Sequence, residues 1–233
     1  PLLTPEDIPY DCALVFNAGV EKINGKYVMI FRNDYGTNEE LVKQKIGFKG
    51  TAIGVAISDN GVDGWKVREI PLCNYVFADQ DAKHDEVWRL YDPRITVIEG
   101  EIFLCLAMDT RHGVCGAIAK VDENFEKLEI LSVTTPDNRN MVLFPEKIDG
   151  YYYRLERPFP VYSRGGKDRF DIWISKSPDM KFWGESKLVL AVEDVPWANN
   201  KIGPAAPPVK TDKGWLATFH AVDTAPGRLH NSW

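Results

Sequence analysis

Three basic side chains follow a turn-forming glycine at nearly the same distance along the chain. Arg32 follows Gly25 by seven residues, Arg157 follows Gly150 by seven, and His220 follows Gly214 by six. If the glycines open equivalent strands, these side chains end the strands at one common site, where they could bind an anion. The alternative is that they are surface partners of carboxylates, the commoner role of arginine. Arg139 and Lys201, each close to loop-forming residues, could join the same basic site.

Asp92 is the leading acid candidate. It precedes Pro93 and follows Tyr91, with Trp88 close by. Asp-Pro typically forms a turn, and a turn at the start of a strand is the simpler interpretation. Aromatic neighbours, however, suit a sugar ring, and partial desolvation raises a carboxyl pKa toward the range of a general acid. The sequence therefore leaves both a turn and a catalytic acid open for Asp92.

Repeated hairpins must position these residues. Four turns, at 24–25, 99–100, 149–150 and 212–214, each join an apolar or basic approach to a run of strand-forming residues. Asn-Gly and Asp-Gly between such runs predict type I′ hairpins, because both central residues need positive φ. Four similar hairpins in one chain indicate one repeated supersecondary unit.

Further strands complete each unit. An alternating strand and a polar turn lead to a bulky residue, Trp65, Phe125 or Trp183. Together with the hairpin they make a four-stranded antiparallel sheet, the blade of a β-propeller. The predicted copies span about 14–70, 92–131, 141–190 and 204–222, with little helix. A β-sandwich is the alternative. Because a propeller must close to protect its strand edges, we expect residues 1–233 to be a single catalytic propeller domain that is incomplete at its C-terminus.

The composition excludes several classes of protein. The 233 residues are 44% hydrophobic, enough for one sizeable domain. A net charge of −6 argues against nucleic acid or an anionic membrane as partner. The four histidines are scattered, the four cysteines form no CxxC pair, and no P-loop or GxGxxG occurs, so we expect no metal and no cofactor. Without an 18-residue apolar stretch or a signal-peptide pattern, we expect a cytoplasmic protein.

Several motifs, in order, carry a family resemblance. They are Asp92-Pro93-Arg94, the segment 138–147, Glu156-Arg157-Pro158 and the segment 201–208, flanked by Asn17-Ala18-Gly19 and Phe219-His220-Ala221-Val222. In these motifs the chain resembles glycoside hydrolase family 130, the mannoside phosphorylases, which are five-bladed β-propellers. The resemblance implies an all-β, five-bladed β-propeller whose C-terminal part is missing from this chain, since the family is longer.

The same resemblance implies residue roles. Asp92 matches the general acid, whose proton would pass through the 3-hydroxyl of the bound mannose. The positions that match phosphate-binding residues are Arg139, Arg157, Lys201 and His220. The positions that match the mannose subsite are Asn17, Arg32, Asp34 and Tyr91. The strand count thus groups Arg32 with the basic site, whereas the resemblance places it nearer the sugar.

The chemistry of this set favours phosphorolysis. Inverting hydrolysis needs an acid and a base, whereas phosphate arrives as an anion and needs an acid with a cationic cradle. We therefore expect inverting phosphorolysis of β-mannosides to α-mannose 1-phosphate, with inorganic phosphate as co-substrate. β-1,4-Linked mannooligosaccharide, mannosyl-glucose and mannosyl-N-acetylglucosamine are the first substrates to test, and β-1,2 linkages stay open.

Two rival functions stay open at this stage, a β-mannosidase and a non-catalytic carbohydrate-binding propeller. Loops 36–49 and 160–169 are expected to select the acceptor sugar. Family members are often homo-oligomers, so the resemblance also implies self-association.

Overall fold

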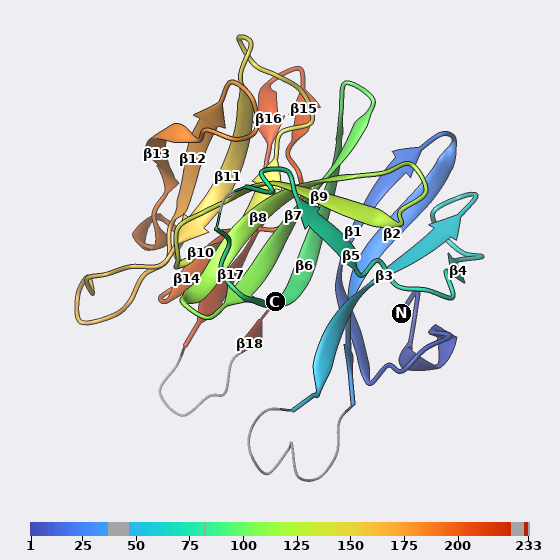
Figure 1. Ribbon diagram of the computed structural model, residues 1–233. Helices are drawn as coiled ribbons and strands as arrows, with labels where there is room; N and C mark the ends of the chain where they lie inside the picture. Colours follow the sequence, from blue (N-terminus) through green and yellow to red (C-terminus); the bar gives the residue numbers. More distant parts are fainter. Residues whose placement is uncertain (37–46, 82, 225–230, 233) are drawn as a thin grey trace.

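The computed structural model describes residues 1–36, 47–81, 83–224 and 231–232. In these segments, regular structure is almost entirely β, as predicted, with two short 3-10 helices, η1 (Pro5–Asp7) and η2 (Val192–Asp194). The sheets succeed one another in chain order, from blue through green and orange to red in Figure 1. No helix of the described segments is long and apolar enough to cross a membrane.

The first and third sheets are four-stranded antiparallel meanders. The first contains β1 (Leu14–Ile23), β2 (Lys26–Tyr35), β3 (Gly50–Ser58) and β4 (Lys66–Val67). The third contains β10 (Asn138–Leu143), β11 (Tyr152–Pro158), β12 (Ile172–Ser177) and β13 (Gly184–Leu190). Both agree closely with the predicted blades.

The second and fourth sheets depart from the meander. The second contains β6 (Val87–Ile98), β7 (Glu101–Thr110), β8 (Gly113–Val121) and β9 (Lys127–Val133), with β5 (Asn74–Phe77) added parallel to β9. In the fourth, β14 (Lys201–Pro204) pairs with β17 (Phe219–Asp223) and β17 with β18 (Asn231–Ser232). Between β14 and β17, β15 (Val209–Thr211) and β16 (Gly214–Leu216) form a separate two-stranded hairpin. The innermost strands β1, β6, β10 and β14 contact one another in that order. This radial succession is that of a five-bladed β-propeller, of which the described residues supply four blade sheets.

The hairpin turns follow local backbone chemistry. Three of them have positive φ at both central residues, with pairs of 50° and 82° at Asn24-Gly25, 53° and 82° at Glu99-Gly100, and 50° and 81° at Asp149-Gly150. These are the predicted type I′ turns. The fourth differs, because only Gly214 has positive φ, at 120°. There the two residues before the glycine form the turn and the glycine follows as a bulge.

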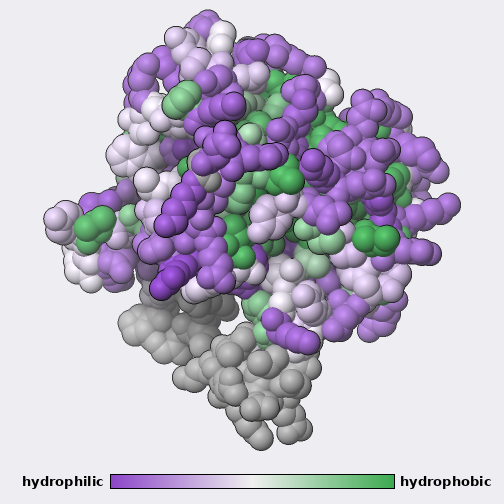
Figure 2. Space-filling view, in the orientation of Figure 1, coloured by the Kyte–Doolittle hydropathy of each residue, from purple (hydrophilic) through white to green (hydrophobic). Residues whose placement is uncertain are grey.

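Apolar side chains fill the spaces between the sheets. The first and second sheets pack through Ile30, Val55, Ile95 and Leu104, each at most 1% exposed. Smaller clusters join the second sheet to the third and the third to the fourth. Fully burying one such side chain stabilises the fold by about 1.5–3 kcal/mol. On the face drawn in Figure 2, hydrophilic residues accordingly predominate.

Candidate active site

Three innermost strands bulge at corresponding positions. The register shifts lie between Phe16 and Gly19 in β1, between Tyr91 and Arg94 in β6, and between Arg139 and Val142 in β10. Inside each bulge one residue has positive φ: 52° at Asn17, 53° at Asp92 and 59° at Asn140. Asn and Asp tolerate this conformation better than other side chains. A bulge changes the direction in which a side chain points. The side chains of Asn17, Asp92 and Asn140 each contact polar groups of a neighbouring blade.

Asp92 lies inside β6 rather than at the start of a strand. The sequence places the second blade from about residue 92, whereas β6 begins at Val87. Pro93 lacks an N–H, and the bulge is a position in a sheet where the missing donor is tolerated. The Asp-Pro pair therefore marks a bulge within the strand, and the turn interpretation is wrong.

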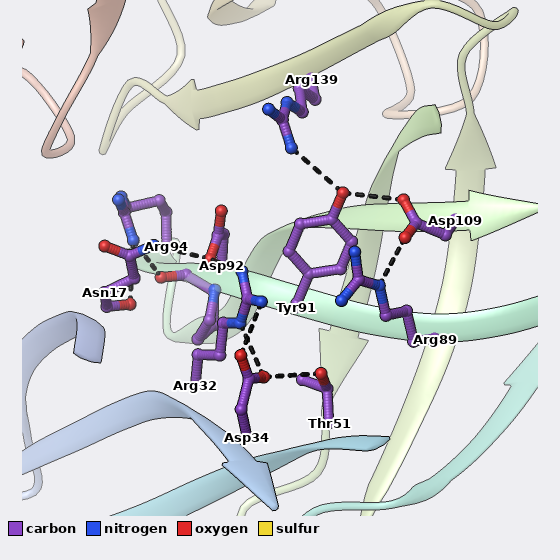
Figure 3. Close-up of polar contacts among 11 residues, drawn as sticks. Asn17, Arg32, Asp34, Thr51, Arg89, Tyr91, Asp92, Arg94, Asp109 and Arg139 are labelled. Atoms are coloured by element: carbon purple, nitrogen blue, oxygen red, sulfur yellow. Dashed lines mark hydrogen bonds and ion pairs between the residues drawn. The ribbon is translucent and has the colours of Figure 1, made fainter. Parts of the chain in front are cut away.

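Asp92 belongs to a network of carboxylates and donors drawn in Figure 3. Its Oδ1 accepts hydrogen bonds from Asn17 Nδ2 at 2.7 Å and from Arg32 Nη1 at 3.3 Å. Arg32 also donates from Nε and Nη2 to both oxygens of Asp34, at 2.9 and 2.8 Å. Thr51 donates to Asp34 Oδ1 at 2.6 Å. The network brings together three of the four predicted sugar-site residues and the predicted acid.

The charge of Arg32 is well compensated. Burial disfavours its cation, but the bonds to Asp34 and the charge of Asp92 outweigh burial and leave its pKa above the ordinary value. Its guanidinium also lies over the rings of Phe16, at 4.6 Å, and Tyr91, at 4.9 Å. This fixed cation can orient a sugar hydroxyl or the acid itself.

The four predicted phosphate-binding residues gather in a second cluster. Arg157 is 2% exposed, and its Nη1 lies 3.2 Å from His220 Nε2. Burial, and then the charge of Arg139, lower the pKa of Arg157 to about 10. Burial and the charge of Arg157 lower the pKa of His220 to about 4, and the same two causes lower the pKa of Lys201. The four side chains are thus close enough to repel one another.

This basic cluster has unmet hydrogen-bonding capacity. Arg139 Nε and Arg157 Nε are buried without a hydrogen-bond partner. Among the described residues no carboxylate forms an ion pair with Arg139, Arg157 or Lys201. Buried cations are normally paired, so an anion with several acceptor oxygens is the ligand that the cluster fits.

Gly203 lets β14 approach the basic cluster. A Cβ at this position would lie 2.7 Å from His220 Cε1 and 2.8 Å from Arg157 Nη1. Both distances are shorter than van der Waals contact, so a larger residue would displace the two predicted phosphate ligands.

Tyr91 connects the two clusters. Its hydroxyl donates to Asp109 Oδ1 at 2.7 Å and accepts from Arg139 Nη1 at 3.1 Å. The guanidinium of Arg89 lies over the Tyr91 ring at 4.5 Å and forms an ion pair with Asp109. Tyr91 therefore lies between the carboxylate network and the basic cluster.

The strand count and the structure disagree on Arg32. Arg32 and Arg157 do occupy matching positions, opposite Phe16 and Arg139 in their hairpins. Successive blades are rotated about the axis, however, so matching residues point to different parts of the centre. Arg32 therefore reaches Asp92 and Asp34, as the resemblance implies, and lies outside the basic cluster.

Sequence reasoning missed several residues of the site. Arg94 donates from Nε to the Ala205 carbonyl at 2.6 Å and from Nη1 to the Asn17 carbonyl at 3.1 Å, joining three blades. The others are Thr51, Arg89, Asp109, Asn140 and Gly203. Arg94, Asn140 and Gly203 lie within motifs that carry the family resemblance, but no local motif shows the contacts of any of these residues, because their partners come from other strands or other blades. Of the loops expected to select the acceptor, residues 37–46 lie outside the described part of the chain.

Comparison with known proteins defines the class and then the family. The fold resembles glycoside-active propellers such as the Cellvibrio cellulosa α-L-arabinanase, with a TM-score of 0.60 and 12% identity over 98% of this chain and 75% of that one. The β-1,2-mannobiose phosphorylase of Listeria innocua, solved with β-1,2-mannobiose, has a TM-score of 0.74 and 23% identity over 95% of this chain and 73% of that one. Residues 3–228 match the family model of glycoside hydrolase family 130, described as beta-1,4-mannooligosaccharide phosphorylase. The chain belongs to this family.

Curated relatives agree with the assignment. The beta-1,4-mannooligosaccharide phosphorylase of Ruminococcus albus is 32% identical over 232 residues, covering 95% of this chain and 62% of the relative. The 1,2-beta-oligomannan phosphorylase of a Thermoanaerobacter species is 29% identical over 230 residues, covering 96% and 70%. With the other curated relatives included, this chain spans between 37% and 70% of the relatives' length.

Proposed function

We propose that this protein is an inverting phosphorylase of β-mannosides, which converts a β-mannoside and inorganic phosphate to α-mannose 1-phosphate and a shortened acceptor. The observation that carries the proposal is the basic cluster around the buried Arg157, which lacks a carboxylate partner among the described residues and adjoins the network around Asp92. Family membership supports the substrate class, since the relatives are named as phosphorylases of β-1,4- and β-1,2-linked mannosides.

The pairing of the carboxylates supports phosphorolysis over hydrolysis. An inverting hydrolase needs a second carboxylate free to activate water. Here Asp34 is held by Arg32, and Asp109 is held by Arg89. In the described part of the site, neither is available as a base, whereas a phosphate oxygen needs no base to attack.

Each residue has a role in this mechanism. Asn17, Arg32, Asp34 and Tyr91 would bind and orient the mannosyl unit. Asp92 would supply the proton to the leaving oxygen, relayed through the 3-hydroxyl of the mannose. Arg139, Arg157, Lys201 and His220 would bind phosphate on the opposite face of the sugar, so that attack inverts the anomeric centre. Because the acid and the anion act on opposite faces, the product would be the α-phosphate.

The linkage and acceptor are proposed in order of preference. The family model is described for β-1,4-mannooligosaccharide, so β-1,4-mannobiose is the first substrate, followed by mannosyl-glucose, mannosyl-N-acetylglucosamine and β-1,2-mannobiose. The homo-oligomer and the cytoplasmic location inferred from the sequence stay predictions.

The experiment is incubation of the purified protein with each disaccharide, with and without inorganic phosphate, followed by phosphorus and proton NMR. Phosphate-dependent formation of α-mannose 1-phosphate supports the proposal. Free mannose regardless of phosphate would identify a β-mannosidase. Sugar binding without turnover of any of these substrates would identify a carbohydrate-binding propeller.

An Asp92→Asn variant tests the acid. It should lose more than about a hundredfold in kcat, the usual contribution of a general acid, yet still bind phosphate. Asp59→Asn is the matched control, because Asp59 is exposed and pairs only with Lys26 among the described residues, and it should leave kcat unchanged. Full activity of Asp92→Asn would refute the assignment.

A further inference from the structure

Asp109 lies near the C-terminal end of β7. It does not contact the predicted phosphate-binding residues itself, but it is linked to one of them, Arg139, through Tyr91. One carboxylate oxygen, Oδ1, accepts the Tyr91 hydroxyl at 2.7 Å, and the other, Oδ2, accepts Arg89 Nε. The Asp109 side chain is 18% exposed and Tyr91 is 1% exposed. Two separate donors thus occupy the two oxygens of one partly buried carboxylate.

The ionised carboxylate fixes the direction of the Tyr91 hydroxyl. A phenol has one proton to donate, and an ionised carboxylate can only accept. The proton of Tyr91 must therefore point to Asp109, which leaves the oxygen lone pairs facing Arg139 Nη1 at 3.1 Å. Burial, and then the bond to Asp109, raise the pKa of Tyr91 to about 12, so the hydroxyl keeps its proton.

Arg139 depends on this acceptor for its orientation. In the described part of the chain, the bond to Tyr91 is the one hydrogen bond that the Arg139 side chain makes. Its Nε is buried without a partner, and its guanidinium lies 5.8 Å from the Phe159 ring centre, a non-directional contact. Without the Tyr91 acceptor, the guanidinium could rotate away from the rest of the basic cluster.

We propose that Asp109 is a positioning residue that holds the Tyr91 hydroxyl in one direction and thereby orients Arg139 toward the bound anion. The inference deepens the proposed function, because it takes the anion to be the phosphate of that reaction. It assigns a role to a carboxylate that touches neither the phosphate ligands nor Asp92.

Asp109→Asn tests the direction of the hydrogen bonds with little change in shape. The amide has one acceptor oxygen where the carboxylate has two, so it can serve Tyr91 or Arg89 but not both. If its NH₂ faces Tyr91, the hydroxyl reverses and points its proton at Arg139, donor against donor. If its NH₂ faces Arg89, that pair becomes repulsive and the side chain is forced to move. Both arrangements weaken the orientation of Arg139.

The expected result is a rise of about tenfold in the Kd and KM for inorganic phosphate, the usual order for one hydrogen bond to a charged group. The change in kcat at saturating phosphate should be less than about threefold. Tyr91→Phe, which keeps the ring and loses the hydroxyl, should give the same rise. The double variant should be no worse than either single one, since both remove one relay.

Glu101→Gln is the matched control. Glu101 lies at the other end of the same strand, in an exposed ion pair with Lys120, so its loss should leave phosphate binding unchanged. Calorimetric titration with inorganic phosphate needs no turnover, and cooperative thermal unfolding of each variant checks its fold.

The outcomes separate the two proposals. If the unaltered protein binds no phosphate, the proposed function fails. If it binds phosphate but Asp109→Asn and Tyr91→Phe bind equally well, the proposed function stands and the positioning role of Asp109 is wrong. Additive losses in the double variant would also overturn the relay. Should Asp109→Asn fail to fold, Tyr91→Phe decides alone.

Discussion

Replacing Arg157 by methionine should stabilise the protein when phosphate is absent, although it removes a hydrogen bond. Arg157 is 2% exposed, and no carboxylate of the described chain pairs with it. Burial and the charge of Arg139 lower its pKa from the ordinary value for arginine to about 10. Its charged form is therefore less favourable in the folded protein than in the unfolded chain.

The size of the effect follows from this shift. At about 1.36 kcal/mol per pKa unit, the charge of Arg157 costs the folded state about 3 kcal/mol. At pH 7, below both the folded and the unfolded pKa, the group is charged in both states and the whole penalty applies. It would fall only as the pH rises above about 10. Methionine cannot make the hydrogen bond to His220, and the loss of this bond costs about 1 kcal/mol. The free energy of unfolding should therefore rise by a net amount of about 1–2 kcal/mol. For a domain of this size that raises Tm by about 2–8 °C.

Arg154→Met is the matched control on the same strand, and it should have the opposite effect. Arg154 Nη2 lies 2.9 Å from Glu156 Oε2, and the two side chains are 8% and 6% exposed. Removing the arginine leaves Glu156 as a buried charge without its cation, which typically costs 3–5 kcal/mol. Asn138 Nδ2 still donates to Glu156 at 2.8 Å, which favours the lower end of that range.

The assay is thermal unfolding with and without phosphate at constant ionic strength. At a phosphate concentration of about 100 Kd, the unaltered protein should gain about 2.7 kcal/mol. Without phosphate, Arg157→Met should be more stable than the unaltered protein, and phosphate should stabilise it little further. Arg154→Met should be less stable than the unaltered protein without phosphate, but phosphate should stabilise it by the full amount. If Arg157→Met is less stable without phosphate, or retains the full phosphate gain, the reasoning is refuted.

Two further predictions concern the same cluster. Gly203→Ala places a methyl group against His220 and Arg157. The KM for phosphate should therefore rise at least about tenfold, and the free energy of unfolding should fall by about 1–3 kcal/mol. An unchanged KM for phosphate in steady-state kinetics would contradict this. Burial and neighbouring cations lower the pKa of His220 to about 4. Between about pH 6.5 and 4, the unfolded chain therefore binds a proton at this histidine that the folded protein does not bind. The stability of the protein without phosphate should accordingly fall as the pH drops through this range. His220→Asn should flatten this part of a pH-dependent unfolding series, and an unchanged slope would rule out His220 as its source.

The parts of the fold that are governed by local chemistry could be predicted from the sequence. Asn24-Gly25 and Asp149-Gly150 form the expected turns, because the need for positive φ restricts the residues that fit. The hairpins then placed the first and third blades. The fourth turn differs in type because Asp212 and Lys213 take ordinary φ and only Gly214 takes a positive one.

The site was predictable only in part. Arg157 and His220 could be grouped by counting from their glycines, because both lie on strands that end near the axis. Asp92 was recognised as an acid candidate, but its place in a bulge depends on how β6 pairs with β7. Asp109 gave no signal, because its role depends on a cross-strand neighbour and on an arginine from the next blade. Such contacts are set by tertiary packing, which a single sequence does not display.

The arrangement of charge links phosphate binding to the stability of the fold. Arg139, Arg157 and Lys201 lie in one cluster, and no carboxylate of the described residues forms an ion pair with them. Beyond burial, the charge of Arg139 lowers the pKa of Arg157, and the charges of Arg157 and Arg139 lower the pKa of Lys201, so the three cations repel one another. His220, whose pKa is lowered to about 4, adds no charge to this repulsion at neutral pH. The empty site therefore gives up stability, and a bound phosphate dianion would recover it by neutralising the three charges.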